Sequence, residues 1–260
     1  MTAYFKSIWS TRFFLFSLIK YDLNTRYQRS ILGVGWSLIQ PIGMTIVLCT
    51  VFHRLFGVNI REFGPFLLAG IAFWSYFTNS VLTGCQCFFQ AEPYMRQYPA
   101  PAAIYPMRAA LGAMFHFLMA LGIVLTLTWV MQGVSNLHAL PILLPTLILL
   151  VIFGWSMATL AALANTHFPD SQHLIDLGMQ ALFYLTPIIY PPEILNDRGL
   201  GWLVKYNPIA SILELIRAPI LHGQLPSTKA VYTALILTGA AFGLASFALT
   251  RVQKQLVFKL

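Results

Sequence analysis

Charged residues are scarce in this sequence, and their scarcity excludes most kinds of soluble protein. Asp, Glu, Lys and Arg make up 9% of the 260 residues, whereas hydrophobic residues make up 58%. A soluble domain carries about 25% charged residues. The three cysteines, Cys49, Cys85 and Cys87, show no metal-ligand spacing, which favours small buried side chains over a metal or redox site. The composition predicts a chain whose solvent is largely lipid.

Motifs for nucleotide binding and for hydrolysis are absent as well. The chain contains no G-x-x-x-x-G-K-[ST] phosphate-binding loop, no H-E-x-x-H and no G-x-S-x-G. His116 falls inside a predicted span, where a hydrogen bond to a neighbouring helix is favoured over a proton-carrying role. We therefore expect no catalytic residue, no metal and no cofactor in this chain. The net charge of +8 does not call for a nucleic-acid partner, because basic residues beside membrane spans are attracted to an anionic inner leaflet.

Long intervals without charge predict the membrane spans. A helix needs about 20 apolar residues to cross the hydrocarbon core. Residues 30–53, 63–91 and 230–250 each form such an interval, and residues 109–169 are long enough for two spans with a polar break between them. A sixth span is harder to define, because the charge-free interval after Asp176 is short. That span must begin before Asp176 or stop short of the far surface.

The predicted fold is an all-α membrane protein, because open β-hairpins cannot close their backbone hydrogen bonds in lipid. Six spans are predicted in one domain over residues 1–260, at 30–56, 63–90, 107–131, 139–166, 172–190 and 229–250. With the N-terminus inside, most of the 16 Lys and Arg residues fall on the inner side. The positive-inside rule thus predicts both termini in the cytoplasm.

Three segments outside the spans have patterns of their own. Residues 1–29 are predicted to hold a helix on the inner membrane surface, because apolar residues such as Trp9 and Phe16 recur at helical spacing. Packing of this helix against the protein's own spans is the alternative. Residues 91–106 are predicted to form a stiff, proline-rich cytoplasmic loop. Residues 191–228 are expected on the outer side.

The outer segment is predicted to contain a short helix that starts at Asn207 and Pro208, a typical helix start. Its apolar stripe consists of Ile209, Ile212, Leu213, Ile216 and Ile220. About 15 residues do not cross a membrane, so we expect this helix to dip into the outer leaflet or to pack over the outer mouth, after a shorter helical piece at 192–195. Glu214 and Arg217 are spaced to form an ion pair, which either eases their burial or is a surface pair of little consequence.

Aromatic side chains give the richest remaining signal. Rings along a water-filled path can stack on the C–H faces of sugars with few strong binding points, which suits a sliding polymer; interfacial belts and lipid contact are the alternative. Pro41 should kink the first span near Gln40, and a bent helix can line a cavity. The candidate path residues are Trp36, Gln40, Phe73, Trp74, Phe77, Phe183, Tyr184 and Tyr190.

Four stretches together resemble one known family. Residues 26–57, with Arg26-Tyr27, Leu32-Gly33, Trp36 and Pro41 in place, are similar to the opening of the membrane subunits of ABC-2 type polysaccharide exporters. The stretch YMRQYPAPAAIYPM resembles the family's cytoplasmic loop, although Ala102-Ala103 stands where relatives carry Arg-Glu. FPDSQHLIDLGMQALFYLTPIIYP resembles its fifth-span block, and YNPIASILELIRAPILHG resembles the N-P and R motif that follows.

This resemblance implies a permease subunit that exports a lipid-linked polysaccharide across the bacterial cytoplasmic membrane. It implies that a second copy of the chain completes a conduit and that two copies of a separate ATPase subunit bind ATP and Mg²⁺. The loop between spans two and three would form a coupling helix, and the segment after span five would form re-entrant helices. The implied ATPase-coupling residues are Glu92, Tyr94, Met95, Arg96, Tyr98, Pro101, Ile104 and Pro106. The implied outer-gate residues are Asn207, Pro208, Glu214 and Arg217.

Three alternatives remain at this stage. An ABC-2 exporter of drugs or small lipids shares the architecture. A secondary transporter or channel would work without an ATPase. Proton-coupled transporters usually need more buried acidic residues than this sequence offers, so this alternative is weakly supported. A membrane-embedded enzyme is disfavoured, because the sequence offers no set of nucleophile, base or metal ligands.

Overall fold

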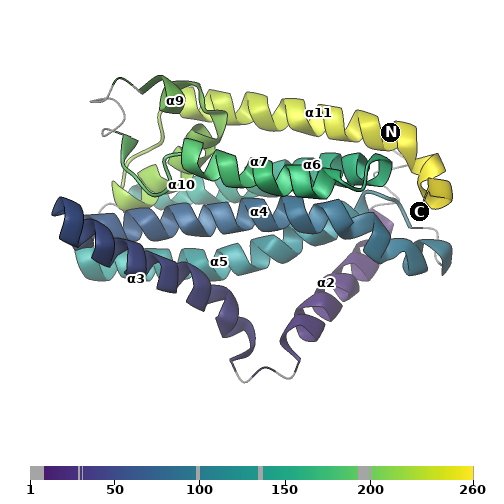
Figure 1. Ribbon diagram of the computed structural model, residues 1–260, viewed down its shortest axis with the longest axis horizontal. Helices are drawn as coiled ribbons and strands as arrows, with labels where there is room; N and C mark the ends of the chain where they lie inside the picture. The colour runs from purple at the N-terminus through teal and green to yellow at the C-terminus, as the bar shows by residue number, and fades with distance from the viewer. Residues whose placement is uncertain are drawn as a thin grey trace.

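Figure 1 shows the computed structural model, which describes residues 9–28, 30, 32–97, 100–133, 137–192, 199 and 201–259. Helices account for all the regular secondary structure of these residues, which confirms the predicted all-α class. The helices are α2 (Arg12–Tyr27), α3 (Trp36–Phe56), α4 (Ile60–Gln97), α5 (Ile104–Gln132), α6 (Leu143–His167), α7 (Ser171–Leu185), α9 (Gly201–Tyr206), α10 (Pro208–Leu221) and α11 (Thr228–Lys259). Short 3₁₀ turns at Gly33–Gly35 and Leu137–Ile142 precede α3 and α6.

Five helical stretches of the described chain are long and apolar enough to cross a membrane. They are Gly33–Leu55, Ile60–Met95, Ile104–Gln132, His138–His167 and Thr228–Val252. They agree with five of the six predicted spans, because long charge-free intervals leave a helix as the only way to satisfy the backbone in lipid.

The region predicted as the fifth span is shorter than expected. Helix α7 has 15 residues, a length of about 22 Å, whereas the hydrocarbon core is about 30 Å thick. The helix ends at Leu185 because Thr186 takes an extended conformation before Pro187, as residues that precede proline usually do. A turn over residues 186–190 continues the chain, so a sixth crossing stays a prediction.

Helix α4 lies at the centre of the bundle and packs against α3, α5, α6, α7 and α10 (Figure 1). Its buried side chains include Phe73, Tyr76 and Phe88, and the Tyr76 hydroxyl donates a 2.6 Å hydrogen bond to the carbonyl of Leu150 on α6. Gly84 allows α4 to approach the backbone of α6 closely, since a Cβ atom there would lie 2.6 Å from the Cα of Ala158. Close packing of this kind holds membrane helices together, because lipid supplies no hydrophobic drive between them.

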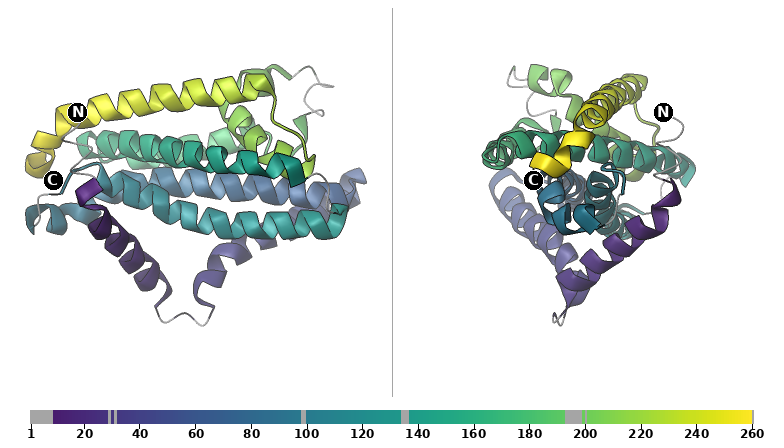
Figure 2. Two further views of the ribbon diagram at one scale, coloured as in Figure 1. Left: turned by 180° about the vertical axis from the view of Figure 1, so that it is seen from behind. Right: turned by 90° about the vertical axis from the view of Figure 1, so that its right-hand side faces the viewer.

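Helices α2 and α3 form a V that diverges from the bundle (Figures 1 and 2). Leu15 and Leu18 of α2 are buried in an apolar cluster at one end of the bundle, whereas Trp9, Phe13 and Phe16 are largely exposed. The helix therefore packs on the protein's own spans along one side and presents rings along another. The helix ends at Tyr27, inside the predicted region 1–29, and residues 1–8 of that region lie outside the described chain.

The chain order gives the bundle two distinct ends. The α4–α5 turn and the C-terminal part of α11 lie at one end, which we call the inner end because the sequence predicts it on the cytoplasmic side (right in Figure 1). The α3–α4 turn, α9, α10 and the start of α11 lie at the other, which we call the outer end. Candidate functional residues gather at both ends and on the face that joins them.

Candidate functional site

The inner turn differs from the predicted loop over 91–106. Residues 91–97 continue helix α4, and α5 already begins at Ile104. Figure 1 shows the last turns of α4 bent away from the rest of the helix. Pro93 accounts for the bend, because it lacks the N–H that a helix needs and its ring clashes with the preceding turn. The turn between the helices is thus short, and its flanks are helical.

Two groups of predicted coupling residues are distinguished by burial. Glu92, Tyr94, Met95 and Pro101 are half-buried and keep part of their surface at the inner end. Ile104 and Pro106 are buried, so these two side chains support the turn from inside and offer no surface to a partner. The turn is fixed from below, since the Trp155 indole donates a 3.1 Å hydrogen bond to the carbonyl of Ala103.

The structure leaves two further coupling residues without a side-chain description. The backbone of Arg96 is helical, but its side chain lies outside the described part of the structure, and so does Tyr98. Their role therefore remains as the sequence predicts it.

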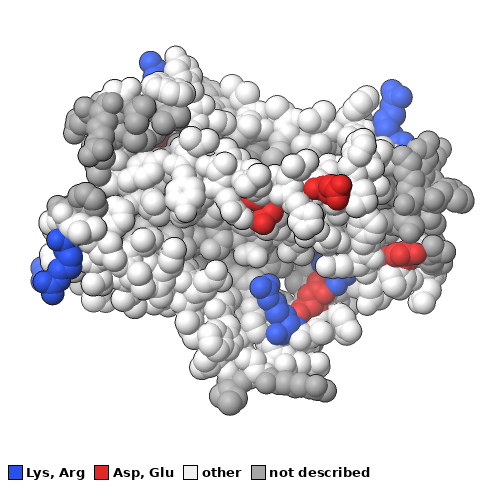
Figure 3. Space-filling model, in the orientation of Figure 1, with Lys and Arg blue, Asp and Glu red and all other residues white. Residues whose placement is uncertain are grey.

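A second feature of the inner end is an ion pair that sequence reasoning missed. Arg108 on α5 makes a bidentate pair with Asp22 on α2. The Arg108 side chain is 13% exposed and that of Asp22 is 43% exposed. The pair borders a small cavity between α2, α4 and α5, visible as a hollow in Figure 3 where charges of both signs meet. It fixes α2 to the base of α5. Neither residue has a sequence neighbour that could have revealed the pairing.

His116 lies beside this cavity and behaves as the sequence predicted. Both of its ring nitrogens are 3.4 Å from the hydroxyl of Tyr27 on α2, and the two rings meet edge to face with centroids 5.8 Å apart. The described residues offer no group of three His, Cys, Asp or Glu side chains that would hold a metal ion.

The candidate path residues fall into two groups. Phe73, Trp74 and Phe77 are buried within the bundle, where Phe77 stacks on Phe153 with ring centroids 5.3 Å apart. Phe183 packs against Trp74 at 5.7 Å. These rings fill the core of one chain, so in this structure they do not border a path. A cluster of aromatic residues in a span predicts burial and exposure equally well, and packing decides between them.

The other path residues lie at the surface. Trp36 opens α3 and is 55% exposed, and Gln40 is exposed one turn further along. Tyr184 on α7 is 66% exposed. Tyr190 is half-buried, and its hydroxyl donates a 2.6 Å hydrogen bond to the carbonyl of Tyr184.

Helix α7 carries an exposed polar stripe, of which only Tyr184 was predicted as part of the path. His173, Gln180 and Tyr184 are exposed, and they recur at helical spacing along one side together with the half-buried Asp176. The spacing of three, four and four residues was available in the sequence as the signal. Polar groups at membrane depth face other protein or water and avoid lipid. Figure 2 shows α3 and α7 on the same side of the molecule, to the left in the right-hand view.

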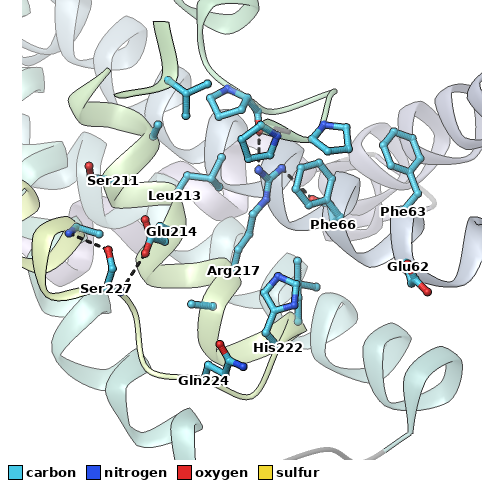
Figure 4. Close-up of a pocket in the computed structure, with 18 of the residues that line it drawn as sticks. Glu62, Phe63, Phe66, Ser211, Leu213, Glu214, Arg217, His222, Gln224 and Ser227 are labelled. Carbon is cyan, nitrogen blue, oxygen red and sulfur yellow. Dashed lines mark hydrogen bonds between the residues drawn. The ribbon is translucent and has the colours of Figure 1, made fainter. Parts of the chain in front are cut away.

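The outer end contains a cavity of about 870 Å³. Its lining comes from the α3–α4 turn, the outer end of α4, α10 and the start of α11 (Figure 4). Polar and charged side chains on this lining include Glu62, Glu214, Arg217 and His222. Cavities of this size hold ligands in many proteins.

Helix α10, which forms part of this lining, begins where the sequence predicted. Asn207 caps the helix, since its side-chain oxygen accepts a 2.9 Å hydrogen bond from the Ile209 amide, and Pro208 occupies the first helical position. The Asn207 amide also donates to the Thr186 hydroxyl at 3.0 Å, which ties α10 to the end of α7. The stripe of Ile209, Ile212, Leu213, Ile216 and Ile220 is buried in the core. The shorter helical piece predicted at 192–195 lies almost entirely outside the described residues, and α9 precedes α10 instead.

The predicted Glu214–Arg217 ion pair does not form. A Glu214 oxygen accepts a 3.0 Å hydrogen bond from the Ser227 amide, and its side chain points away from the Arg217 guanidinium (Figure 4). Arg217 is 7% exposed and donates instead to three backbone carbonyls, those of Phe66, Pro187 and Ile188. The spacing of Glu214 and Arg217 suited an ion pair, but the guanidinium instead binds carbonyls that have no helical partner in the turn after α7. Burial lowers the pKa of Arg217 to about 9, which still leaves the guanidinium protonated at neutral pH.

Comparison with known proteins identifies the family of this chain. A family model described as ABC-2 type transporter matches residues 14–221, from α2 through α10. The chain belongs to the ABC-2 type transporter family. The family match thus contains the inner turn, the polar stripe of α7 and the outer cavity.

Relatives of this ABC-2 chain carry more specific names. The O-antigen export system permease protein RfbA of Klebsiella pneumoniae is 26% identical over 207 residues, which cover 78% of each chain. A protein of the same name from Myxococcus xanthus is 24% identical over 226 residues, or 86% of each chain. The polysialic acid transport protein KpsM of Escherichia coli is 19% identical over 212 residues, which cover 78% of this chain and 80% of that protein.

Proposed function

We propose that this chain is the permease subunit of an ATP-driven exporter that moves a lipid-linked polysaccharide across the bacterial cytoplasmic membrane. The names of its relatives, which concern O-antigen export and polysialic acid transport, support a polysaccharide substrate. The polar stripe of α7 carries the proposal on the structural side. Hydroxyl, imidazole and amide groups on an exposed face of a membrane helix are expected to face a water-filled space, because exposure to lipid is costly for them.

The path is proposed to run along α3 and α7, between this chain and a second copy of it. Helices α3 and α7 lie on the same side of the molecule (Figure 2). The residues that would border the path are exposed on these helices: Trp36 and Gln40 on α3, and His173, Gln180 and Tyr184 on α7. A hydroxyl-rich polymer suits such a lining, since amide and hydroxyl groups exchange hydrogen bonds with it at little net cost and do not hold it in place.

Six crossings with both termini in the cytoplasm remain the proposed topology. Helix α6 ends at the inner end and α11 starts at the outer end (Figure 1). The chain between them must therefore travel the depth of the bundle, and α7 with the turn at 186–190 is the segment that does so. Helices α9 and α10 then form the outer re-entrant segment of the predicted region 191–228.

The partner ATPase is proposed to bind the inner turn. Helix α4 is about 57 Å long, well over the thickness of the hydrocarbon core, so its inner turns project into the cytoplasm. The partly exposed Glu92, Tyr94 and Met95 would contact the ATPase, while Ile104 stiffens the turn from inside. ATP and Mg²⁺ would be bound by that partner, with no cofactor in this chain.

Purification of the tagged chain from its native membrane in mild detergent tests this proposal. We expect an ATPase subunit in stoichiometric amount, and we expect the Arg96→Glu variant to recover less of it while still reaching the membrane. Absence of any ATPase across several detergents would favour a secondary transporter instead.

A further inference from the structure

Arg217 joins three parts of the outer end through one side chain. Its Nη1 donates to the carbonyl of Pro187 at 2.5 Å, and its Nη2 donates to the carbonyl of Ile188 at 2.9 Å. The same Nη2 also donates to the carbonyl of Phe66 on α4 at 3.0 Å. A single nitrogen thus connects α4 with the turn after α7, while the side chain itself belongs to α10. Figure 4 shows this arrangement, with the guanidinium between the proline turn and Phe66.

The guanidinium also lies on the ring of Phe66, with its carbon 3.6 Å from the ring centroid. Cation–π contact of this kind favours Arg where water is excluded. Gly70, one turn along α4 from Phe66, leaves the room for it. A Cβ atom on Gly70 would collide with Nη2 and would also lie 3.1 Å from the carbonyl oxygen of Ile188. Glycine at this position is therefore a condition for the contact.

Filling space does not explain this choice of side chain. A buried cation without a carboxylate partner is costly to place, and an apolar side chain would fill the same volume without that cost. The guanidinium does what an apolar side chain cannot, because it satisfies carbonyls of two separate elements at once. Its Nε remains buried without a hydrogen-bond partner, so the side chain is held by its two terminal nitrogens, which are the ones that join the elements.

Helix α4 connects this contact with the inner turn. It runs as one helix from Ile60 to Gln97, and its two prolines, Pro65 and Pro93, lie near its ends. The long middle section carries no proline and is packed tightly on α6 at Gly84. The section between the two prolines has no such break and moves as a rigid element, so a displacement that reaches it at the Pro93 bend is passed on to Phe66 and Gly70.

We infer that Arg217 is the positioning residue that fixes the outer segment, meaning α10 with the turn at 186–190, on helix α4, so that the outer segment moves together with α4. This inference rests on the proposed function, because it gives the inner turn and the outer segment one mechanical connection within an ATP-driven exporter. Without Arg217, ATP hydrolysis at the inner end would proceed without a matching change at the outer end.

Coupling between hydrolysis and export tests the inference. In complexes purified with the ATPase, Gly70→Ala and Arg217→Met should keep ATP hydrolysis within about twofold of the parent, while export falls about ten- to a hundredfold, the factor for losing a charge-assisted hydrogen bond. Arg217→Lys, which keeps the charge but not the fork, should recover part of the export. Gly122→Ala is the matched control, because a Cβ atom there meets nothing within 4 Å.

A distance measurement gives a second readout that does not depend on export. With the three native cysteines replaced, spin labels at the exposed positions Arg61, at the outer end of α4, and His222, at the end of α10, report how these two helices move. We expect one narrow distance distribution that stays unchanged when ATP and vanadate trap the complex, and a broadened one in Gly70→Ala.

Two results would overturn the inference. One is hydrolysis and export that fall in proportion, or do not fall, in Gly70→Ala and Arg217→Met. The other is a parent protein in which the Arg61–His222 distance changes on trapping. Failure of the proposed function looks different, since the unmodified chain would then recover no ATPase at all.

Discussion

The ion pair between Asp22 and Arg108 gives the most detailed prediction about the inner end. The Asp22→Asn substitution removes the charge that balances Arg108. Loss of one partner costs about 3–5 kcal/mol in a fully buried pair and about 0–1 kcal/mol in an exposed one. Because Arg108 is 13% exposed and Asp22 is 43% exposed, we expect a value between these limits, about 1.5–3 kcal/mol.

The loss of free energy in Asp22→Asn should destabilise α2 and leave the rest of the bundle unchanged, since α2 packs chiefly against α5. Opening of α2 should become roughly 10- to 150-fold more frequent, the factor that this free energy implies. Amide hydrogen exchange of the protein in lipid nanodiscs measures it directly, because exchange in a local opening follows its free energy. Residues 12–27 should exchange faster, while α5 and α6 keep their protection.

Two matched variants control for this result. Asp176→Asn removes a carboxylate that accepts a 3.3 Å hydrogen bond from the Gln180 amide within the same helix, α7. Amide exchange in α2 should therefore not change. The charge-reversed double variant, Asp22→Arg with Arg108→Asp, should restore part of the protection. Unchanged exchange of α2 in Asp22→Asn, or equal acceleration across the whole bundle, would refute the reasoning.

Three further predictions concern the packing and the two candidate surfaces. Gly84→Ala should lower the free energy of unfolding by about 1–3 kcal/mol through overpacking against α6, as measured by thermal unfolding in detergent. Gly122→Ala should be neutral or slightly stabilising, and equal effects of the two substitutions would contradict the packing argument. Gln180→Leu should reduce polymer export and leave the unfolding temperature unchanged, because the side chain is exposed, and normal export would remove the α7 stripe from the path. Tyr94→Ala should weaken recovery of the ATPase without loss of folded protein, and a fall in folded protein would instead assign Tyr94 to the core.

The sequence was sufficient for features that depend on local chemistry. Charge-free intervals predicted the long helices, since lipid leaves the backbone few alternatives. Asn207 and Pro208 predicted the start of α10, because capping and a fixed φ angle act within one turn. The apolar stripe of that helix predicted which of its sides is buried.

Features that depend on which elements become neighbours were not predictable in the same way. The spacing of Glu214 and Arg217 suggested an ion pair, but no local pattern shows that the carbonyls of Pro187 and Ile188 lie closer. Phe73 and Phe77 read as path residues until the packing of α6 against them is known. The pairing of Asp22 with Arg108 likewise follows only from the way α2 lies on α5.

ATP-driven movement of polymer tests the central claim most directly. The experiment uses inverted vesicles of the cytoplasmic membrane that contain the chain, its ATPase and the lipid-linked polysaccharide. In such vesicles the face that is outermost in the cell lines the lumen, so export carries the polymer into the lumen. The proposed function predicts polymer that becomes protected inside the vesicles on addition of ATP, and not with vanadate or without this chain. Protection that is independent of ATP, or that is driven by a proton gradient alone, would contradict it.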